Sequence, residues 1–393
     1  MGRMRKDAAD AITGSGAPVR ILSIETSVVS LPFDIGGPPP LFAGKPWTNL
    51  EILLVRIETE DGFTGWGEAF GHVSIPATRA ALDSVVAPLC IGRDSGDINA
   101  LTRDLARAVH LLGRNGPFVY ALSGIDIALW DIAGKRAGLP LHRLLGGGPV
   151  DSLTGYASLL WFGDPARVAE NVRAARERGY GLVKLHETTL EAVRAAKDAA
   201  EGAEIMLDTN CPWTVAQAVG MARKLKHDGL HWLEEPVWPP EDHAGLARVR
   251  REGIRIAAGE NAAGLHDFKH MFDAGALDIA QPSVTKIGGV SEMRRIISLA
   301  EAYGVDVVPH CPYFGPGFLA SLHVIAAMPA KPPVEVLWKD MEANPFDPWV
   351  RADNGRVRVP QGPGLGCDPD PHTLERYHLG APTVTREAGQ PVS

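Results

Sequence analysis

Cysteine is scarce in this sequence, and the few cysteines present form no pattern. Four occur among the 393 residues, without a CxxC pair or zinc-finger spacing, at Cys90, Cys211, Cys311 and Cys367. Scattered cysteines of this kind are typical of free thiols in a reducing compartment. No run approaches the roughly 18 consecutive apolar residues that cross a bilayer. We therefore expect a cytoplasmic protein that is not inserted in a membrane.

Positive charge is also in short supply. Lys and Arg number 39 against 47 Asp and Glu, which gives a formal net charge of −8. A nucleic-acid partner requires a basic surface to meet its phosphates, so this composition argues against one. Residues 1–19 lack the apolar segment of a secretory signal and are rich in Gly, Ala and Ser, so we expect a flexible tail there.

The first folded part of the chain is predicted to mix strands and helices. The overall composition, 45% hydrophobic and 22% charged, is ordinary for a globular protein. Strand patterns occupy residues 21–30, 50–59 and 63–68, and the last two flank a Glu-Asp-Gly turn typical of a hairpin. Helical periodicity follows as far as Gly138. We therefore predict an α+β domain over residues 20–148.

From residue 149 onward, strand and helix patterns alternate. Eight strand-like runs are present, at 153–157, 182–186, 205–208, 231–234, 254–259, 277–281, 305–310 and 334–338. Helical patterns with capping residues separate them. Parallel strands joined by helices close at eight into a barrel, so we predict a (β/α)8 TIM barrel over residues 149–343. The Pro- and Gly-rich segment 344–393 is expected to wrap back over an earlier domain or to fray.

Three acidic residues each close an apolar strand-like run. Asp208, Glu234 and Glu260 follow one another at intervals of 26 residues, which fits one strand, one helix and two short loops. All three should therefore lie at one end of the barrel, where a divalent cation usually neutralises such a cluster. Strand alternation directs the neighbouring Glu235 away from the mouth and returns Asn210 to it, where Asn210 can hydrogen-bond a substrate.

Other polar residues also fall at strand ends, where the loops of a barrel build the site. Lys184 and His186 share one face of a strand, so both can point into the barrel mouth. His310 ends the seventh strand, Glu335 lies in the eighth, and Lys286 lies in a turn after the sixth. We interpret Lys184, His186 and His310 as catalytic and Lys286 as structural. Glu335 is interpreted as a substrate contact or as one partner of an ion pair at the rim.

One longer motif carries a family resemblance. The run ALSGIDIALWDIAGKRAGLPLHRLLGG, residues 121–147, resembles a signature of the enolase superfamily, specifically of the mandelate racemase/muconate lactonizing enzyme family. Lys184-x-His186 is similar to the KxK motif of this family. The resemblance covers roughly residues 20–370.

Later motifs match the same family in order. The residues around Asp208, Glu234 and Glu260 resemble its three metal-ligand motifs, and His310 matches the histidine that marks the mandelate racemase type. The resemblance implies a modified (β/α)8 TIM barrel with an N-terminal α+β capping domain, completed by the C-terminal segment. It also implies Mg²⁺, a small-molecule carboxylate substrate and a homo-oligomer. The implied reaction removes the proton α to the carboxylate, and Lys184 helps to stabilise the resulting dianion.

Two positions depart from the family pattern. His186 stands where a base lysine is common, and a histidine can serve as a base near neutral pH without the desolvation that a lysine needs. Ser283 stands where racemase-type members usually carry an aspartate that hydrogen-bonds the histidine. A serine orients an imidazole but does not stabilise its protonated form as a carboxylate does. His310 is therefore expected to act mainly as an acid or as a substrate contact, or to find another partner.

The leading functional prediction is a lyase that dehydrates a sugar acid, an aldonate or aldarate, to a 2-keto-3-deoxy acid. One group removes the α-proton, and a histidine acid assists departure of the β-hydroxyl. A racemase, epimerase or cycloisomerase on the same scaffold is the first alternative. Racemisation needs a base on each face of the α-carbon, and Lys184, His186 and His310 together can supply both bases. A barrel that binds metal and acids without turnover is the second. Loops 33–47 and 71–76 are expected to form the roof over the substrate.

Overall fold

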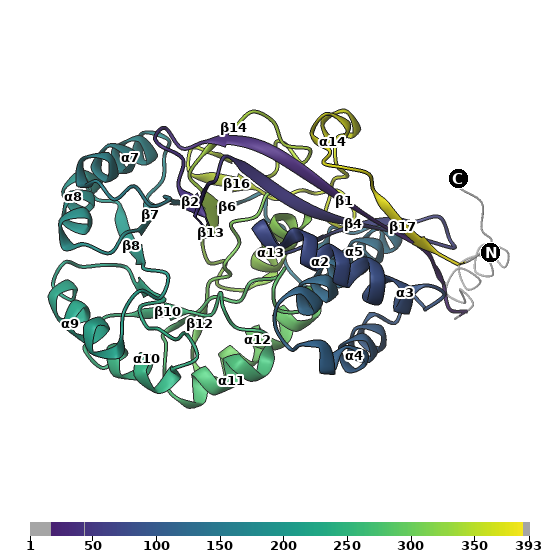
Figure 1. Ribbon diagram of the computed structural model, residues 1–393, viewed down its shortest axis with the longest axis horizontal. Coiled ribbons are helices and arrows are strands. Elements are labelled where there is room, and N and C mark those ends of the chain that lie inside the picture. Colours follow the sequence, from purple (N-terminus) through teal and green to yellow (C-terminus); the bar gives the residue numbers. More distant parts are fainter. Residues whose placement is uncertain (1–16, 43, 388–393) are drawn as a thin grey trace, which may run out of the picture.

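The structure, a computed structural model, describes residues 17–42 and 44–387. Figure 1 shows a ring of helices around a barrel of strands, with an antiparallel sheet and its helices at one side. The predicted fold class is confirmed: a capping domain accompanies a (β/α)8 barrel. Most of the tail predicted over residues 1–19 lies outside the described residues, as do residues 388–393.

Three antiparallel strands form the body of the capping sheet: β1 (Ile21–Asp34), β4 (Asn49–Thr59) and β5 (Thr64–Ala69). Alternation of apolar and polar residues predicted β4, the Glu-Asp-Gly turn predicted β5 as its hairpin partner, and a β-rich run predicted β1. Two later strands also pair with β1: β14 (Asp340–Met341) and β17 (Thr383–Arg386). The end of the chain therefore completes the capping sheet. This return begins at β14, ahead of the boundary that we predicted at residue 344.

Helix α5 (Pro117–Ala137) packs against β5 and reaches the barrel. It is apolar on nearly every side because it contacts both the capping sheet and the barrel. Two glycines of β5 allow the close approach, since a Cβ at Gly67 would lie 2.0 Å from the Gly124 carbonyl oxygen. The other capping elements are β2 (Leu41–Phe42), β3 (Lys45–Pro46), η1 (His72–Ser74), α2 (Ile75–Ala81), η2 (Leu82–Val86), α3 (Ala87–Cys90), α4 (Ile98–Ala108), η3 (His110–Leu112) and α6 (Leu141–Leu144).

Parallel strands alternate with helices through the barrel. Within the described residues the strands are β6 (Ser152–Ser158), β7 (Leu182–His186), β8 (Glu204–Asp208), β9 (Leu233–Glu234), β10 (Ile256–Ala258), β11 (Ile279–Ala280), β12 (Asp306–Val307) and β13 (Val334–Leu337). The helices between them are α7 (Pro165–Glu177), α8 (Leu190–Ala200), α9 (Val215–Leu225), α10 (His243–Arg250), α11 (Leu265–Asp273), α12 (Gly289–Tyr303) and α13 (Pro316–Ala327). The predicted strand runs all contain the observed strands or overlap them.

The barrel has a seam between its last two strands. Ladders connect β6 through β12 in order, and β13 pairs with β6 from the other side. No ladder joins β12 to β13 among the described residues. A side chain bridges this seam, because the Cys311 N–H donates to Glu335 Oε2 at 3.1 Å. Beyond β13, the hairpin of β15 (Ala352–Asp353) and β16 (Arg356–Arg358) pairs with β6, and α14 (Pro371–Tyr377) lies against β1.

Two buried carboxylates of the capping domain hold it against the barrel. Glu68 on β5 accepts a hydrogen bond from the Gly317 N–H at 2.8 Å, at the start of α13. Asp126 on α5 accepts one from the Ser291 N–H at 3.0 Å, at the start of α12. The first N–H groups of a helix lack intrahelical partners and favour negative charge. Burial nevertheless raises the pKa of Glu68 and that of Asp126 to about 7.

The barrel interior is closed by a small apolar layer. It consists of residues that lie in, or directly beside, the strands β6 and β8 to β12: Tyr156, Met206, Trp232, Ala257, Ile279 and Val308. This layer is the floor on which the polar residues of the mouth rest, so the barrel is a packed core rather than a pore. No helix within residues 17–42 and 44–387 combines the length and apolarity needed to span a membrane.

Candidate active site

Lys184 lies at the floor of the barrel mouth, surrounded by carboxylates. Its Nζ is 2.8 Å from Glu335 Oε1, 2.9 Å from Glu234 Oε1 and 3.2 Å from Asp208 Oδ2. All four side chains are buried. Glu234 is also held by the Trp232 indole N–H, which donates to Oε2 at 2.8 Å. The lysine ammonium is thus a fixed charge and not a mobile rim group.

Electrostatics in this cluster follow from burial and from the crowding of like charges. Burial alone would lower the pKa of Lys184, but the three carboxylates outweigh it and hold that pKa well above its ordinary range. Burial and then the Asp208 carboxylate raise the pKa of Glu234 well above its usual value. Burial would also raise the pKa of Asp208, yet Lys184 and His186 hold it low. One low and one raised pKa are expected for adjacent carboxylates.

His186 lies beside Asp208 at the end of β7. Its Nε2 is 3.2 Å from Asp208 Oδ2, and its Nδ1 is hydrogen-bonded to the Leu159 carbonyl oxygen. A carbonyl can only accept, so Nδ1 carries a proton. A neutral His186 therefore presents the lone pair of Nε2. Burial lowers the pKa of His186, but the Asp208 carboxylate more than offsets this and leaves that pKa raised.

His310 and Glu260 form a second cluster. His310 follows β12, and the strands β13 and β6 lie between β12 and β7, which carries Lys184 and His186. His310 Nε2 is 2.8 Å from Glu260 Oε2, and its Nδ1 is 2.9 Å from Ser283 Oγ. Ser283 is in turn hydrogen-bonded to the Tyr313 hydroxyl. Burial would raise the pKa of Glu260, but His310 and Lys286 lower it to about 2. Sequence reasoning anticipated the contact between Ser283 and His310 and missed Tyr313.

The carboxylates suit a divalent cation by chemistry and by charge. Asp208 and Glu234 end β8 and β9, Glu260 lies two residues beyond the end of β10, and all three offer the oxygen ligands that Mg²⁺ prefers. Together with Glu335 they carry more negative charge than the Lys184 ammonium balances, and burial followed by the Asp208 charge raises the pKa of Glu234. In the described residues, however, no three His, Cys, Asp or Glu side chains converge as a ready metal site. Asp208 and Glu234 turn instead toward Lys184, while Glu260 turns toward His310.

Three further residues at the mouth were given roles from the sequence. Glu335 is buried and accepts from Ser158 Oγ at 2.8 Å as well as contacting Lys184, so its carboxylate is enclosed by protein and holds the lysine. This placement does not support the predicted substrate contact. Asn210 is exposed at the rim, where its side chain can meet a ligand. Glu235 points to the Gly259 N–H at 2.9 Å and away from Lys184.

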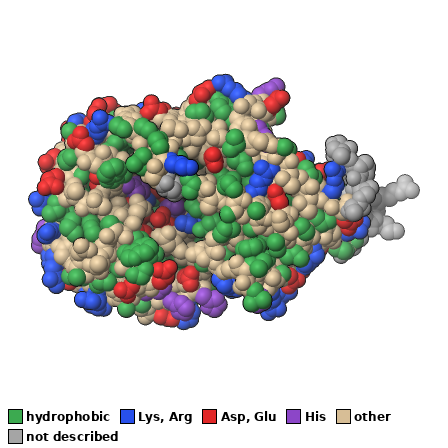
Figure 2. Space-filling model, viewed as in Figure 1, with side chains coloured by type: hydrophobic (Ala, Val, Ile, Leu, Met, Phe, Trp, Pro, Cys, Tyr) green, Lys and Arg blue, Asp and Glu red, His purple; other side chains and the backbone are tan. Residues whose placement is uncertain are grey.

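Aromatic residues of the capping domain form a roof over the mouth. Ring centroids lie 5.5 Å apart for Trp47 and His72, 4.8 Å for His72 and Phe70, and 5.0 Å for Phe70 and Tyr120. Phe70 also approaches Tyr313 of the barrel, at 6.3 Å. Both loops that we predicted as the roof contribute to it. Figure 2 shows the hollow on this face, with acidic, histidine and basic side chains inside it.

Lys286 belongs to this mouth, although its turn position favoured a structural interpretation. It is 9% exposed, and its Nζ lies 5.0 Å from the centroid of the Phe70 ring. The burial of His72, and then the positive charge of Lys286, lower the pKa of His72 to about 4. Lys286 forms no ion pair with any of the described residues, in contrast to Lys184. The sequence signal was present, a lysine just beyond a strand end, but nothing local distinguished it from a turn residue.

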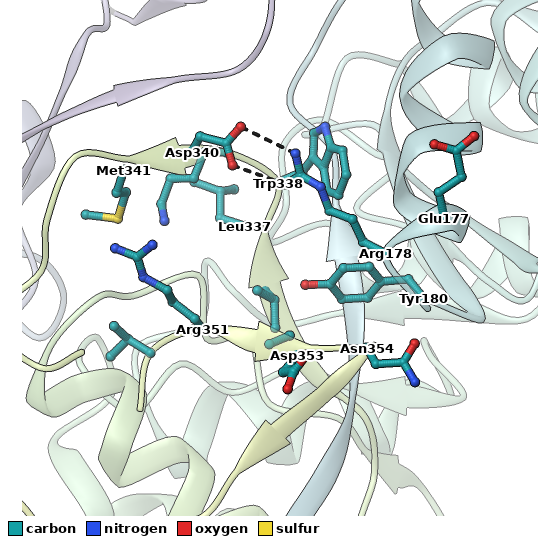
Figure 3. Close-up of a pocket in the computed structure, with 14 residues that line it drawn as sticks. Glu177, Arg178, Tyr180, Leu337, Trp338, Asp340, Met341, Arg351, Asp353 and Asn354 are labelled. Atoms are coloured by element: carbon teal, nitrogen blue, oxygen red, sulfur yellow. Dashed lines mark hydrogen bonds and ion pairs between the residues drawn. The ribbon is translucent and has the colours of Figure 1, made fainter. Parts of the chain in front are cut away.

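A separate cavity of about 480 Å³ lies outside the barrel wall, between α7, β13 and the β15 hairpin. Figure 3 shows Arg178 against Trp338, with its guanidinium carbon 4.4 Å from the ring centroid, and paired with Asp340. None of the residues predicted to be functional lines this cavity. We therefore place the candidate active site at the barrel mouth.

A capped barrel with carboxylates at the carboxyl ends of consecutive strands is the architecture of the enolase superfamily. Two family models match the chain: the mandelate racemase/muconate lactonizing enzyme N-terminal domain over residues 24–146, and the enolase C-terminal domain-like family over residues 167–373. The chain belongs to the mandelate racemase/muconate lactonizing enzyme family. The resemblance seen in the sequence is thereby confirmed.

Similar proteins include cycloisomerases and dehydratases. D-galactarolactone cycloisomerase of Agrobacterium fabrum is 35% identical over 352 residues, 84% of this chain and 92% of the relative. Arabinonate dehydratase of Saccharolobus solfataricus is 30% identical over 342 residues, 84% of this chain and 91% of the relative. The crystal structure of L-talarate/galactarate dehydratase from Salmonella typhimurium LT2, liganded with Mg and L-lyxarohydroxamate, superposes with a TM-score of 0.81. It is 28% identical and covers 95% of this chain and 96% of its own.

Proposed function

We propose that this protein is a Mg²⁺-dependent enzyme that removes the α-proton of a sugar acid and expels the β-oxygen, most simply as an acid sugar dehydratase. Asp208, Glu234 and Glu260 would hold the cation. Bound there, Mg²⁺ would supply a fixed positive charge that stabilises negative charge developing on the substrate carboxylate. A dehydratase relative and a Mg-liganded dehydratase structure support this proposal.

Lys184 acts as a fixed cation rather than as the base. Its three carboxylate partners keep it protonated, since they hold its pKa well above the ordinary range. A permanent positive charge in a buried site stabilises the dianion that forms when the α-proton leaves. His186 is the better base once its Nε2 is released from the Asp208 carboxylate, which lies 3.2 Å away and would turn to the cation. The Leu159 carbonyl then keeps the proton of a neutral imidazole on Nδ1 and leaves Nε2 able to accept.

His310 supplies the second half of the reaction. It lies on a different side of the mouth from Lys184 and His186, with its Nε2 turned inward beside Glu260. A proton delivered from this side to the β-oxygen lets it leave as a neutral group. The observation that carries the proposal is this division of the mouth into two clusters, one around Lys184 and one around His310.

A substrate screen with two variants tests the proposal. Aldonates and aldarates are incubated in D₂O with Mg²⁺, and both the α-deuterium content and the loss of water are followed by mass spectrometry. We expect His186→Asn to abolish exchange and dehydration together. We expect His310→Asn to retain exchange and to lose dehydration by a factor of about 10²–10⁴. If no acid is exchanged or consumed, the barrel binds acids without turnover and the proposal fails.

Cycloisomerisation is the second candidate, because the relative with 35% identity is a cycloisomerase. The two reactions share their bond changes: a proton leaves the α-carbon, and the bond between the β-carbon and its oxygen breaks. When that oxygen is a free hydroxyl, water departs. When it belongs to a ring, the ring opens and the product keeps the mass of the substrate. The mass of the product therefore separates the two outcomes in the same screen.

A further inference from the structure

We propose that Tyr313 and Ser283 form a hydroxyl relay that places the proton of neutral His310 on Nε2, so that His310 gives a proton to the substrate instead of taking one. Tyr313 and Ser283 are positioning residues in this proposal, since neither needs to touch the substrate. The assignment of the proton rests on hydrogen-bond geometry. Its catalytic consequence rests on the proposed function.

The relay is a buried row of three side chains. Ser283 Oγ lies 2.9 Å from His310 Nδ1 and is hydrogen-bonded on its other side to the Tyr313 hydroxyl. The Tyr313 ring stands edge-on to the imidazole, with centroids 6.0 Å apart. All three residues are removed from solvent. Water therefore cannot easily replace a missing donor or acceptor in this row.

The proton count begins at Tyr313. A phenol carries one proton to donate, and Ser283 Oγ is its hydrogen-bond partner among the described residues. The Thr285 hydroxyl also faces Tyr313, but it meets the geometry of a hydrogen bond with none of the described residues and is therefore the poorer acceptor. Because a buried O–H without an acceptor is costly, Tyr313 donates to Ser283. The Ser283 proton is then left for His310, and Nδ1 must accept it as a lone pair.

The other end of the imidazole gives the same answer. Nε2 lies 2.8 Å from Glu260 Oε2, and an ionised carboxylate can only accept. Nε2 therefore carries the proton. Both ends of the ring agree on one tautomer, and every donor in the row has an acceptor.

An aspartate at position 283 would reverse this arrangement. A carboxylate only accepts, so it would place the imidazole proton on Nδ1 and leave a lone pair on Nε2 facing the mouth. Ser283 thus converts a position that favours a base into one that favours an acid. A site with one base, at His186, and one acid, at His310, suits elimination better than racemisation, which needs a base on each face.

The tautomer can be read directly by ¹⁵N NMR of histidine-labelled protein, with and without Mg²⁺. The signals of His310 are assigned from their loss in His310→Asn, at a pH about two units above the ordinary histidine pKa, where imidazoles are neutral. We expect Nε2 of His310 to give the protonated, pyrrole-type shift and Nδ1 the unprotonated, pyridine-type shift. The reverse pattern in the native protein overturns the proposal.

Two relay variants and one control sharpen the result. Ser283→Asp should exchange the two shifts, and Tyr313→Phe should mix them, because the serine proton is no longer directed to Nδ1. Tyr303→Phe removes a phenol from the exposed surface of α12 and should change neither. Circular dichroism checks that each variant folds. Unchanged shifts in a folded Tyr313→Phe variant overturn the relay even if Ser283→Asp does not fold.

A catalytic measurement separates this inference from the proposed function. In D₂O, Ser283→Asp should gain α-deuterium exchange with the acid of opposite α-configuration, which the native protein leaves unlabelled. If the native protein processes no acid, the proposed function fails, while the NMR result still decides the relay. If the native protein dehydrates an acid but its His310 carries the proton on Nδ1, the relay alone fails.

Discussion

The Lys184 ammonium and the Glu335 carboxylate lie 2.8 Å apart at the floor of the barrel mouth, and neither is accessible to solvent. The same carboxylate receives the Cys311 N–H across the seam between β12 and β13. A residue that was predicted to contact substrate therefore serves the lysine and the barrel wall. The Glu335 carboxylate thus neutralises Lys184 and also connects the two strands at the barrel seam.

Replacing Lys184 should damage stability and activity together. Lys184→Met leaves three buried carboxylates without their cation, and breaking buried pairs in this way costs about 3–5 kcal/mol. Loss of the fixed charge should lower kcat by a factor of about 10²–10³. Urea unfolding and turnover of the identified acid measure the two effects. Lys269→Met, at an exposed ion pair, is the control and should cost less than about 1 kcal/mol.

Mg²⁺ should stabilise the native protein through the three strand-end acids. A ligand present at a hundred times its Kd adds about 2.7 kcal/mol to the free energy of unfolding. We expect the melting temperature to rise with Mg²⁺ and to fall back with a chelator. Asp208→Asn should abolish the response. Glu204→Gln, at the exposed start of the same strand, should retain it, and an equal response in both variants would refute the assignment.

The contact between Glu68 and α13 should depend on pH. Burial raises the pKa of Glu68 to about 7, above its ordinary 4.5, so folding favours the protonated form. This contribution is fully present below about pH 4.5 and is lost as the pH rises through about 7. Glu68→Gln should therefore be more stable than the native protein at pH 8, on the order of 2 kcal/mol, and equal to it at low pH. Urea titrations at several pH values test this, and parallel curves for the two proteins would exclude it.

Lys286 should contribute to substrate binding. It is a nearly buried cation at the mouth with no ion-pair partner among the described residues, so an anionic or hydroxylated substrate can meet it. Lys286→Met should raise KM about tenfold, which corresponds to about 1.4 kcal/mol, with a smaller change in kcat. A variant with an unchanged KM and a reduced resistance to urea would return Lys286 to the structural role that its turn position indicated.

The packing of the capping sheet on α5 can be tested with two glycines. A Cβ at Gly67 would lie 2.0 Å from a backbone oxygen of α5, so Gly67→Ala must push the sheet from the helix and should cost several kcal/mol, as overpacking of a core does. Gly220, inside α9, has open space around it. Gly220→Ala should stabilise the protein by about 0.5–1 kcal/mol. Differential scanning calorimetry compares the two.

The strands and the acid cluster could be predicted because their signals are local. Asp208, Glu234 and Glu260 each close an apolar run, and the regular interval between them fixes their common end of the barrel. The helical pattern that ends at Gly138 likewise predicted the α5 region as a helix. Sequence position alone was enough to place these residues.

The remaining roles depend on partners that are distant in the sequence. Nothing near Glu335 indicates that Lys184 and Cys311 will meet its carboxylate. The contact between Tyr313 and Ser283 could not be predicted either, because the sequence does not indicate the course of the loop after His310. Ser283 was predictable only in part. Its contact with His310 followed from the family pattern, but its hydrogen bond with Tyr313 did not.

The pairing of β17 with β1 has a consequence for the order in which the protein is made. During synthesis β1 emerges before the barrel, while the strand that covers its free edge emerges only after the whole barrel. For most of translation, the capping sheet therefore exposes an open edge on which other chains can add. The barrel must be finished before the cap can close, so nascent chains stalled inside the barrel should be the species most in need of chaperones.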